Sequence, residues 1–174
     1  PGSLPGHGYY RFVKDNQSYL IINMNGRAFF ERAFYGLIQN PFFMLDEIIT
    51  HQGQNGDIIV VDFHAEATSE KRMLAEYADG RAQLVVGTHT HVPTADAHIL
   101  PKGTGFISDL GMVGPHDSSL GADKEPVLKN FLTGLPWRYS LAAGQCELGA
   151  VFASIDVEQR CVTHIEHVRR FTTN

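Results

Sequence analysis

Residues 57 to 87 read DIIVVDFHAEATSEKRMLAEYADGRAQLVVG, and this stretch decides the fold. Residues 58–61 are a short, fully apolar and β-branched run, which is typical of a central strand that is covered on both faces. A helix is predicted to start at Thr68 and to stop at Gly80, because glycine commonly ends helices. Residues 83–86 are predicted to form a second buried strand, of which residues 84–86 are apolar. Strand, helix and strand in succession predict a parallel α/β unit.

The segments on either side extend this unit into one α/β domain. In the helix of the opening stretch, Met73, Leu74 and Tyr77 are expected to face the core. Without a repeat, a low-complexity tract or an interdomain linker, residues 1–174 are expected to form a single layered domain. The other predicted strands are residues 9–13, 19–24, 105–108, 137–141, 149–155 and 162–168, and the other predicted helices are 41–53 and 124–132, with an irregular aromatic segment at 26–41.

The composition is that of a globular protein, with 174 residues of which 43% are hydrophobic and 19% charged. No apolar run approaches the ~20 residues of a membrane span, and no signal peptide is recognisable. A cytoplasmic protein without a membrane contact is therefore expected. The formal net charge of −5 and the scattered lysines and arginines argue against duplex DNA as a partner. The chain starts at Pro1 rather than Met, so we expect a processed, engineered or truncated product.

The two cysteines are too few for a disulfide scaffold. Cys146 and Cys161 are predicted on neighbouring strands of a C-terminal hairpin. If Glu158 and Gln159 form its turn, Cys161 faces Asp156, and Cys146 lies far along the other arm. The geometry of disulfides argues against a bridge at that separation. We expect two ordinary buried thiols, which fit a reducing cytoplasm.

Polar residues follow each central strand at the point where the strand ends. His64 follows the first buried strand, and His89 and His91 follow the second. Asp109 follows the third. In parallel α/β sheets, ligands bind on the loops outside the carboxyl ends of the strands. Because imidazole suits zinc, iron and manganese, the three histidines are candidate metal ligands at one edge of the sheet.

Other interpretations stay open for these residues. A histidine at a strand end is often a hydrogen-bonded structural residue, and a single His-x-His pair arises by chance. Glu66 and Asp109 could each orient a ligating imidazole, or could equally cap a turn or a helix. Three imidazoles alone would suit a mononuclear zinc site with an open position for water. The remaining histidines are expected to be solvated surface residues: His7, His51, His98, His116, His164 and His167.

Several longer blocks resemble the YmdB-like family of bacterial metallophosphoesterases. They follow the family's order across nearly the whole chain: DFHAEATSEK (62–71), GRA (80–82), VGTHTHV (86–92), TAD (94–96), LPKGT (100–104) and SDLGMVGP (108–115). The resemblance implies the calcineurin-like fold, a layered sandwich of β-sheets flanked by helices. It also implies a phosphodiesterase that hydrolyses cyclic nucleotides or related phosphodiesters. Such enzymes use two divalent metal ions, with iron expected first and manganese or zinc as alternatives.

The resemblance also assigns roles to the three histidines. His64 and His89 match ligands of one metal, and His91 matches a ligand of the other. Family members carry, before the part that this chain matches, an N-terminal portion with the bridging carboxylate and the histidine that protonates the leaving group. The chain therefore resembles the C-terminal part of a metallophosphoesterase domain, with the N-terminal part missing and no catalytic acid or base of its own. Its expected partners are the phosphodiester substrate and either the missing portion or a second copy.

Two other functions stay open on the sequence. A mononuclear zinc hydrolase acting on an amide or ester would use the three histidines alone. A non-catalytic subunit or interaction module would instead bind through the aromatic segment at residues 29–43. The metal content of a variant that carries both His89→Ala and His91→Ala separates this last interpretation from the enzymatic ones.

Overall fold

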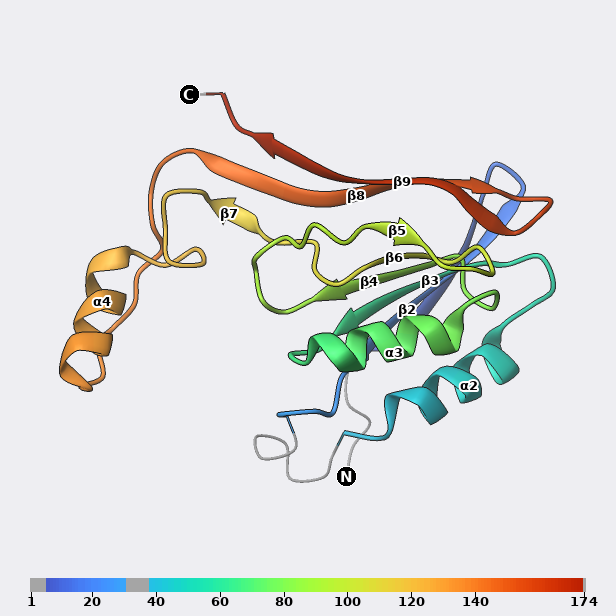
Figure 1. Ribbon diagram of the computed structural model, residues 1–174, viewed down its shortest axis with the longest axis horizontal. Helices are drawn as coiled ribbons and strands as arrows, with labels where there is room; N and C mark the ends of the chain where they lie inside the picture. The colour runs from blue at the N-terminus through green and yellow to red at the C-terminus, as the bar shows by residue number, and fades with distance from the viewer. Residues whose placement is uncertain (1–5, 31–37, 174) are drawn as a thin grey trace.

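The computed structural model describes residues 6–30 and 38–173. It has a mixed α/β fold in which a six-stranded sheet lies between two helices and a smaller, three-stranded sheet (Figure 1). Helices α2 (Pro41–Gln52) and α3 (Thr68–Ala78) cover one face of the large sheet, and the smaller sheet lies over the other (Figure 1). The α/β class predicted from the sequence is confirmed.

The large sheet is parallel at its centre and antiparallel at both edges. Its strand order is β1-β2-β3-β4-β6-β5. The four central strands run parallel, whereas β1 and β5 pair antiparallel with their neighbours. The strand–helix–strand unit predicted from residues 57–87 is therefore correct. The strands are β1 (Tyr9–Lys14), β2 (Gln17–Asn25), β3 (Ile58–His64), β4 (Leu84–Thr88), β5 (His98–Ile99) and β6 (Gly105–Ile107).

The central strands are buried on the face that packs against the helices. On the other face, Val60 and Asp62 of β3 are half-buried, and Asn23 and Asn25 of β2 are exposed, so cover on both faces is incomplete. In β3, Val61 and Phe63 are fully buried, and β2 contributes the fully buried Leu20 and Ile22. These side chains pack with Leu45 of α2 in one hydrophobic core. The core thus fixes β2, β3 and β4 side by side and aligns their carboxyl ends.

Helix α3 presents one stripe of side chains to the sheet. Lys71, Leu74, Ala75 and Ala78 are its buried residues, at the spacing that places side chains on one helix face. The expected burial of Leu74 is confirmed. Met73 and Tyr77 are 52% and 41% exposed, so the prediction that they face the core is wrong. Both positions fall outside the buried stripe that contains Leu74. The prediction relied on the apolar or aromatic nature of the side chains, which does not show on which face of the helix a residue lies.

The smaller sheet has the order β7-β8-β9, with β7 (Val113–Pro115), β8 (Cys146–Asp156) and β9 (Cys161–Phe171) all antiparallel. Asp156 pairs with Cys161, and Cys146 lies at the far end of β8, so the predicted hairpin register is confirmed. Both thiols are free. They are half-buried rather than buried, because the outer face of this sheet is exposed to solvent.

Residues 137–141 do not form the predicted strand. Within the described ranges, this segment pairs with another through an isolated bridge from Leu141 to Ala122. Trp137 and Tyr139 are 43% and 52% exposed. Strand propensity reflects packing on a neighbouring strand, and a single bridge does not supply that packing. Conversely, β5 and β7 were not predicted, since two or three residues are too few to show alternation. Part of the aromatic segment, residues 31–37, lies outside the described residues.

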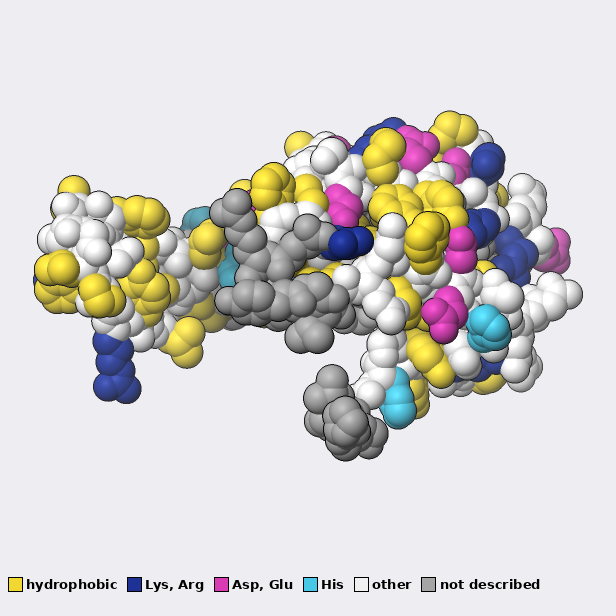
Figure 2. Space-filling view, turned by 90° about the horizontal axis from the view of Figure 1, so that it is seen from below, with side chains coloured by type: hydrophobic (Ala, Val, Ile, Leu, Met, Phe, Trp, Pro, Cys, Tyr) yellow, Lys and Arg dark blue, Asp and Glu magenta, His cyan; other side chains and the backbone are white. Residues whose placement is uncertain are grey.

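Helix α4 (Lys124–Thr133) extends away from the two sheets (Figure 1) and has no buried residue. Leu128, Phe131 and Leu132 are between 58% and 81% exposed. Figure 2 shows hydrophobic side chains gathered on this projection, at the left of the view. The projection therefore presents apolar surface to solvent. Across the described part of the chain, no helix has the length and apolar character needed to cross a membrane.

Candidate metal centre

The carboxyl ends of β2, β3 and β4 meet at one edge of the large sheet. Asn25 pairs with His64, and His64 pairs with Thr88, so the three strand ends lie side by side. The chain leaves β4 directly into His89 and His91. This is the edge at which the sequence predicts a ligand site, and the parallel pairing is the physical reason.

The fold brings His64 and His89 into direct contact. His89 Nδ1 lies 3.1 Å from His64 Nε2. The ring centroids are 4.9 Å apart and the ring planes meet at 86°. The ring of Phe30 packs against both imidazoles, with centroid distances of 6.1 Å to His64 and 4.9 Å to His89. Two of the three predicted ligands therefore share one half-buried position beneath an aromatic ring.

A hydrogen-bond chain from Asp62 through Thr88 sets the tautomer of His64. The Thr88 hydroxyl donates to Asp62 Oδ1 at 2.9 Å, and its oxygen lies 3.1 Å from His64 Nδ1. Because a hydroxyl carries one proton, the Nδ1–H of His64 donates to Thr88 and Nε2 keeps its lone pair. Burial, followed by the charge of His89, lowers the pKa of the His64 imidazole from its usual value. The neutral ring is thus favoured, with its lone pair toward His89.

Glu66 contacts the other imidazole of the pair. Its carboxylate oxygen Oε2 lies 2.8 Å from His89 Nε2. The sequence left two roles open for Glu66, and the structure places it on the outer nitrogen of His89 rather than at a cap. The carboxylate thus lies against the outer nitrogen of the ring, and the opposite nitrogen, Nδ1, faces His64.

His91 does not join the pair. Its side chain is exposed, and its Nδ1 lies 3.4 Å from the backbone oxygen of Leu120. Across residues 6–30 and 38–173, no group of three His, Cys, Asp or Glu side chains is arranged to hold one metal ion. Of the three histidines predicted at this edge of the sheet, His64 and His89 are therefore in contact, and His91 lies apart from them.

The loop that carries His89 and His91 has an unusual backbone. His89 has φ of 122° and His91 has φ of 66°. Positive φ costs a residue with a side chain energy, and such conformations concentrate at functional sites where surrounding contacts maintain them. Asp109 provides one such contact, since its Oδ2 accepts the backbone N–H of Thr90 at 3.0 Å. Asp109 therefore acts on the loop backbone rather than on an imidazole.

Lys71 is a residue of this region that sequence reasoning missed. Its Nζ lies 3.0 Å from Asp109 Oδ2, and the two side chains are 2% and 1% exposed. Burial raises the pKa of Asp109, but hydrogen bonds from the Thr90 and Gly111 amides and from Lys71 outweigh this and lower it overall. A signal was available, because position 71 falls on the buried stripe of α3 with Leu74. A lysine there requires a buried anion.

The other six histidines divide into two groups. The expected surface position is confirmed for His7, His51, His116 and His164, which are exposed. It is wrong for His98 and His167, which are half-buried. His98 Nε2 accepts from Arg72 at 2.7 Å, and His167 Nε2 lies 3.2 Å from the backbone oxygen of Leu110. Both histidines contact residues that are distant in sequence. The alternation of polar and apolar residues along a strand does not predict such contacts.

The donor chemistry of the histidine pair fits two adjacent ligands of one divalent metal ion. Metal–nitrogen bonds of about 2.0–2.1 Å place neighbouring ligand nitrogens roughly 3 Å apart, and the separation between His64 Nε2 and His89 Nδ1 is 3.1 Å. Thr88 and Glu66 contact the outer nitrogens. Such outer contacts are what metal-binding imidazoles usually make. The donor atoms of the two imidazoles are thus suited to form part of a ligand set.

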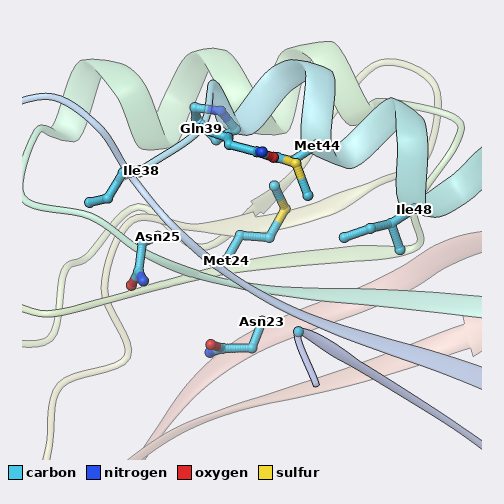
Figure 3. Close-up of a pocket in the computed structure, with 9 residues that line it drawn as sticks. Asn23, Met24, Asn25, Ile38, Gln39, Met44 and Ile48 are labelled. Carbon is cyan, nitrogen blue, oxygen red and sulfur yellow. The ribbon is translucent and has the colours of Figure 1, made fainter. Parts of the chain in front are cut away.

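A cavity of about 290 Å³ lies between the end of β2 and helix α2 (Figure 3). Met24 points toward Met44 of α2, whereas Asn23 and Asn25 lie on the opposite side of the strand (Figure 3). Asn23 Nδ2 donates to Asp62 Oδ2 at 2.8 Å, which ties β2 to the His64 hydrogen-bond chain. The described lining of the cavity contains no ionisable side chain. The described lining of this cavity therefore offers no acid, base or charged ligand of its own.

Comparison with known proteins matches this chain to one protein family. The family model described as YmdB-like protein matches residues 1–168. The chain is 44% identical over 168 residues to the 2',3'-cyclic-nucleotide 2'-phosphodiesterase of Bacillus subtilis (strain 168). The matched region covers 97% of this chain and 62% of that protein. The chain thus spans less than two thirds of the length of this relative.

Two solved structures superpose closely on the fold. A hypothetical protein from Thermus thermophilus matches with a TM-score of 0.87 and 37% identity, over 99% of this chain and 65% of that chain. A structure described as a novel phosphatase, from Mycoplasma pneumoniae, matches with a TM-score of 0.84 and 34% identity, over 95% of this chain and 58% of that chain. The two sheets and their helices are therefore shared with larger proteins.

Proposed function

Because this chain belongs to the YmdB-like family, we propose that it is part of a metal-dependent phosphodiesterase that hydrolyses cyclic nucleotides or related phosphodiesters. The observation that carries the proposal is the 3.1 Å contact between His64 Nε2 and His89 Nδ1 at the carboxyl edge of a parallel sheet. The names of the B. subtilis and M. pneumoniae proteins support phosphate-ester chemistry at this edge.

The finer fold assignment is also a proposal. Two stacked sheets with helices on the outer face of the larger one support a calcineurin-like phosphoesterase sandwich. In this proposal residues 1–174 are the C-terminal part of one metallophosphoesterase domain. The 62% coverage of the B. subtilis relative is in keeping with that. The free cysteines Cys146 and Cys161 support a reducing, cytoplasmic location.

The proposed metal ligands are the three histidines that the family resemblance indicates. His64 and His89 hold one divalent metal ion, and His91 contributes to a second, with iron, manganese or zinc as candidates. The separation of His91 from the pair supports this division. When bound, the metal ions polarise the phosphodiester and supply a hydroxide nucleophile. This chain's residues orient the ligands: Thr88 holds His64 with Nε2 inward, and Glu66 holds His89 with Nδ1 inward.

The two competing functions have less support. A mononuclear zinc hydrolase needs three imidazoles on one metal, and no such group occurs among the described residues. An interaction module that uses residues 29–43 draws on the exposure of Phe29 and Phe43, at 79% and 71%. That exposure does not account for the ordered hydrogen bonds around His64 and His89. The proposal of a phosphodiesterase accounts both for the arrangement of His64 and His89 and for the family membership.

Metal binding by the purified chain tests the proposal. We expect His64→Ala and His89→Ala each to lower the affinity for Mn²⁺ or Zn²⁺ more than about tenfold, because loss of a ligand costs more than loss of an outer contact. Isothermal titration and elemental analysis measure this. His164→Ala is the matched control, since His164 is exposed on β9 and distant in the fold. We also expect weak turnover of bis(p-nitrophenyl) phosphate, because the described residues hold an incomplete ligand set.

Two results would contradict this. Equal metal affinity in the wild type and in both pair variants would remove His64 and His89 as ligands. One tightly held zinc ion per chain together with ester or amide hydrolysis would favour the mononuclear alternative.

Self-association is a second expected property. The exposed apolar side chains of α4 would be partly removed from water by contact with another copy, and burial of apolar surface favours association. Sedimentation equilibrium of the wild type should therefore show dimers or larger species. A variant with Leu128→Ser and Phe131→Ser should shift toward the monomer, whereas Val13→Ser on the edge strand β1 should not. A monomeric wild type at high micromolar concentration would refute this expectation.

A further inference from the structure

The buried ion pair between Lys71 and Asp109 lies directly behind the histidine loop. Its atoms Lys71 Nζ and Asp109 Oδ2 are 3.0 Å apart, and both side chains are almost completely buried. Lys71 comes from the first turn of α3, and Asp109 follows β6. The pair therefore connects two elements that are distant in sequence but adjacent at the carboxyl edge of the sheet. Neither residue has a role in the function proposed above.

The carboxylate of Asp109 holds backbone on two sides. Its Oδ2 accepts the Thr90 N–H at 3.0 Å as well as the lysine ammonium, and its Oδ1 accepts the Gly111 N–H at 2.9 Å. The backbone N–H of Asp109 in turn donates to Thr94 Oγ1 at 2.9 Å. Because Thr90 lies between His89 and His91, the carboxylate anchors the loop at its middle residue.

The anchored loop has a conformation that it would not adopt unaided. His89 and His91, on either side of Thr90, both have positive φ. Such backbone persists only where surrounding contacts over-determine it. A buried carboxylate supplies this contact only while a buried cation compensates its charge, since an unpaired buried charge is strongly unfavourable. Lys71 is that cation, so the loop geometry depends on both partners.

The same helix turn supports the opposite side of the site. Glu70, next to Lys71, accepts the backbone N–H of Arg27 at 2.8 Å and of Ala28 at 3.1 Å. That segment leads to Phe30, whose ring packs on both His64 and His89. Consecutive side chains at the start of α3 thus hold the two loops between which the imidazole pair lies.

We propose that Lys71 and Asp109 are positioning residues for metal binding, which hold the backbone of residues 89–91 so that His89 Nδ1 faces His64 Nε2. This inference rests on the proposed function, in which these two nitrogens bind one divalent cation. Lys71 and Asp109 touch neither the cation nor the substrate. Their effect is transmitted through the Thr90 amide to the orientation of the His89 ring.

The test compares Asp109→Asn and Lys71→Met with Asp57→Asn in the full 174-residue chain. Asp57 is the matched control, because it is also fully buried and paired with a cation, Arg11, but lies at the opposite end of β3. The first measurement is the imidazole ¹⁵N and ¹H spectrum of the metal-free protein, which reports the His64–His89 contact. The second is the affinity for Mn²⁺ or Zn²⁺ by titration calorimetry, below the unfolding temperature of each variant.

We expect both site variants to change the His64 and His89 imidazole signals. We also expect them to bind metal about 10–100-fold more weakly, which is the usual effect of losing an outer contact of a metal site. Asp57→Asn should leave the signals and the affinity unchanged although it lowers stability. If Asp109→Asn does not fold, Thr94→Val removes only the hydroxyl that supports Asp109 and should weaken binding about threefold or more.

Folded variants with wild-type imidazole signals and wild-type affinity would overturn the inference. An equal loss of affinity in Asp57→Asn would overturn it too, since the effect would then reflect general destabilisation. A wild type that binds no metal would refute the proposed function, and the metal-free spectra would still decide whether Lys71 and Asp109 position His89.

Discussion

Replacement of Gly87 by alanine is expected to lower the free energy of unfolding by about 3 kcal/mol or more, the upper end for overpacked core sites. Gly87 lies in β4, one residue before the strand ends. A Cβ atom there would stand 1.8 Å from the backbone oxygen of Ser108 and 2.6 Å from its carbonyl carbon. Backbone atoms cannot rotate away as a flexible side chain could.

The surroundings of Ser108 oppose a compensating shift. Its backbone N–H and its hydroxyl donate to the Asp96 carboxylate at 3.1 and 2.5 Å. The next residue is Asp109, which holds the histidine loop. The strain of Gly87→Ala should therefore be relieved by partial separation of the β4 and β6 ends, with a disturbed His89 as a consequence.

Chemical denaturation followed by circular dichroism measures this effect. Gly114→Ala is the matched control, because Gly114 lies in β7 and its added Cβ would meet only Met112 Sδ, at an ordinary 3.8 Å. We expect that control to stay within about 0.5 kcal/mol of the wild type. Similar stability for the Gly87 variant would show that β6 approaches β4 less closely than the structure indicates.

Loss of the Lys71 ammonium is expected to cost about 3–5 kcal/mol of folding stability, the range for removal of one partner from a buried ion pair. Lys71→Met keeps the aliphatic length of the side chain but leaves the Asp109 carboxylate without its cation. Both side chains are at most 2% exposed, so water cannot replace the lost contact. The unfolding transition measured in urea should move to clearly lower concentration.

Lys129→Met provides the comparison. Lys129 pairs with Glu125 at 2.6 Å on α4, and these side chains are 46% and 72% exposed. An exposed i,i+4 pair contributes little, so the expected change is below about 0.5 kcal/mol. Equal destabilisation by the two lysine replacements would mean that burial of the Lys71–Asp109 pair does not determine its contribution.

Much of the central fold follows from local sequence patterns. The β-branched run at residues 58–61 predicts a buried strand because such residues suit a strand covered on both faces, and the apolar run at residues 84–86 predicts a second one. The helix between them follows from its spacing and from Gly80. Predictions from local pattern failed where the outcome depends on a neighbouring segment. Residues 137–141 have strand-forming residues but pair only through an isolated bridge, and His98 became half-buried because Arg72 and Phe106 lie against it.

The candidate site was predictable in its location but not in its geometry. His64, His89 and His91 follow parallel strands, so their common edge is predictable. The sequence could not show that His64 and His89 make contact while His91 turns toward Leu120. Nor did it reveal Lys71, although the helical spacing of residues 71, 74, 75 and 78 contained that information.

The amino-acid sequence by itself determined the parallel strand–helix–strand core, the edge at which the histidines emerge and the family to which the chain belongs. These depend on side-chain periodicity and on short motifs, which are local properties. Only the tertiary structure decided which imidazoles meet. The direction of each ring depends on the backbone at residues 89 and 91, and that backbone is held by an aspartate and a lysine brought together from positions 109 and 71 by the packing of α3 on the sheet.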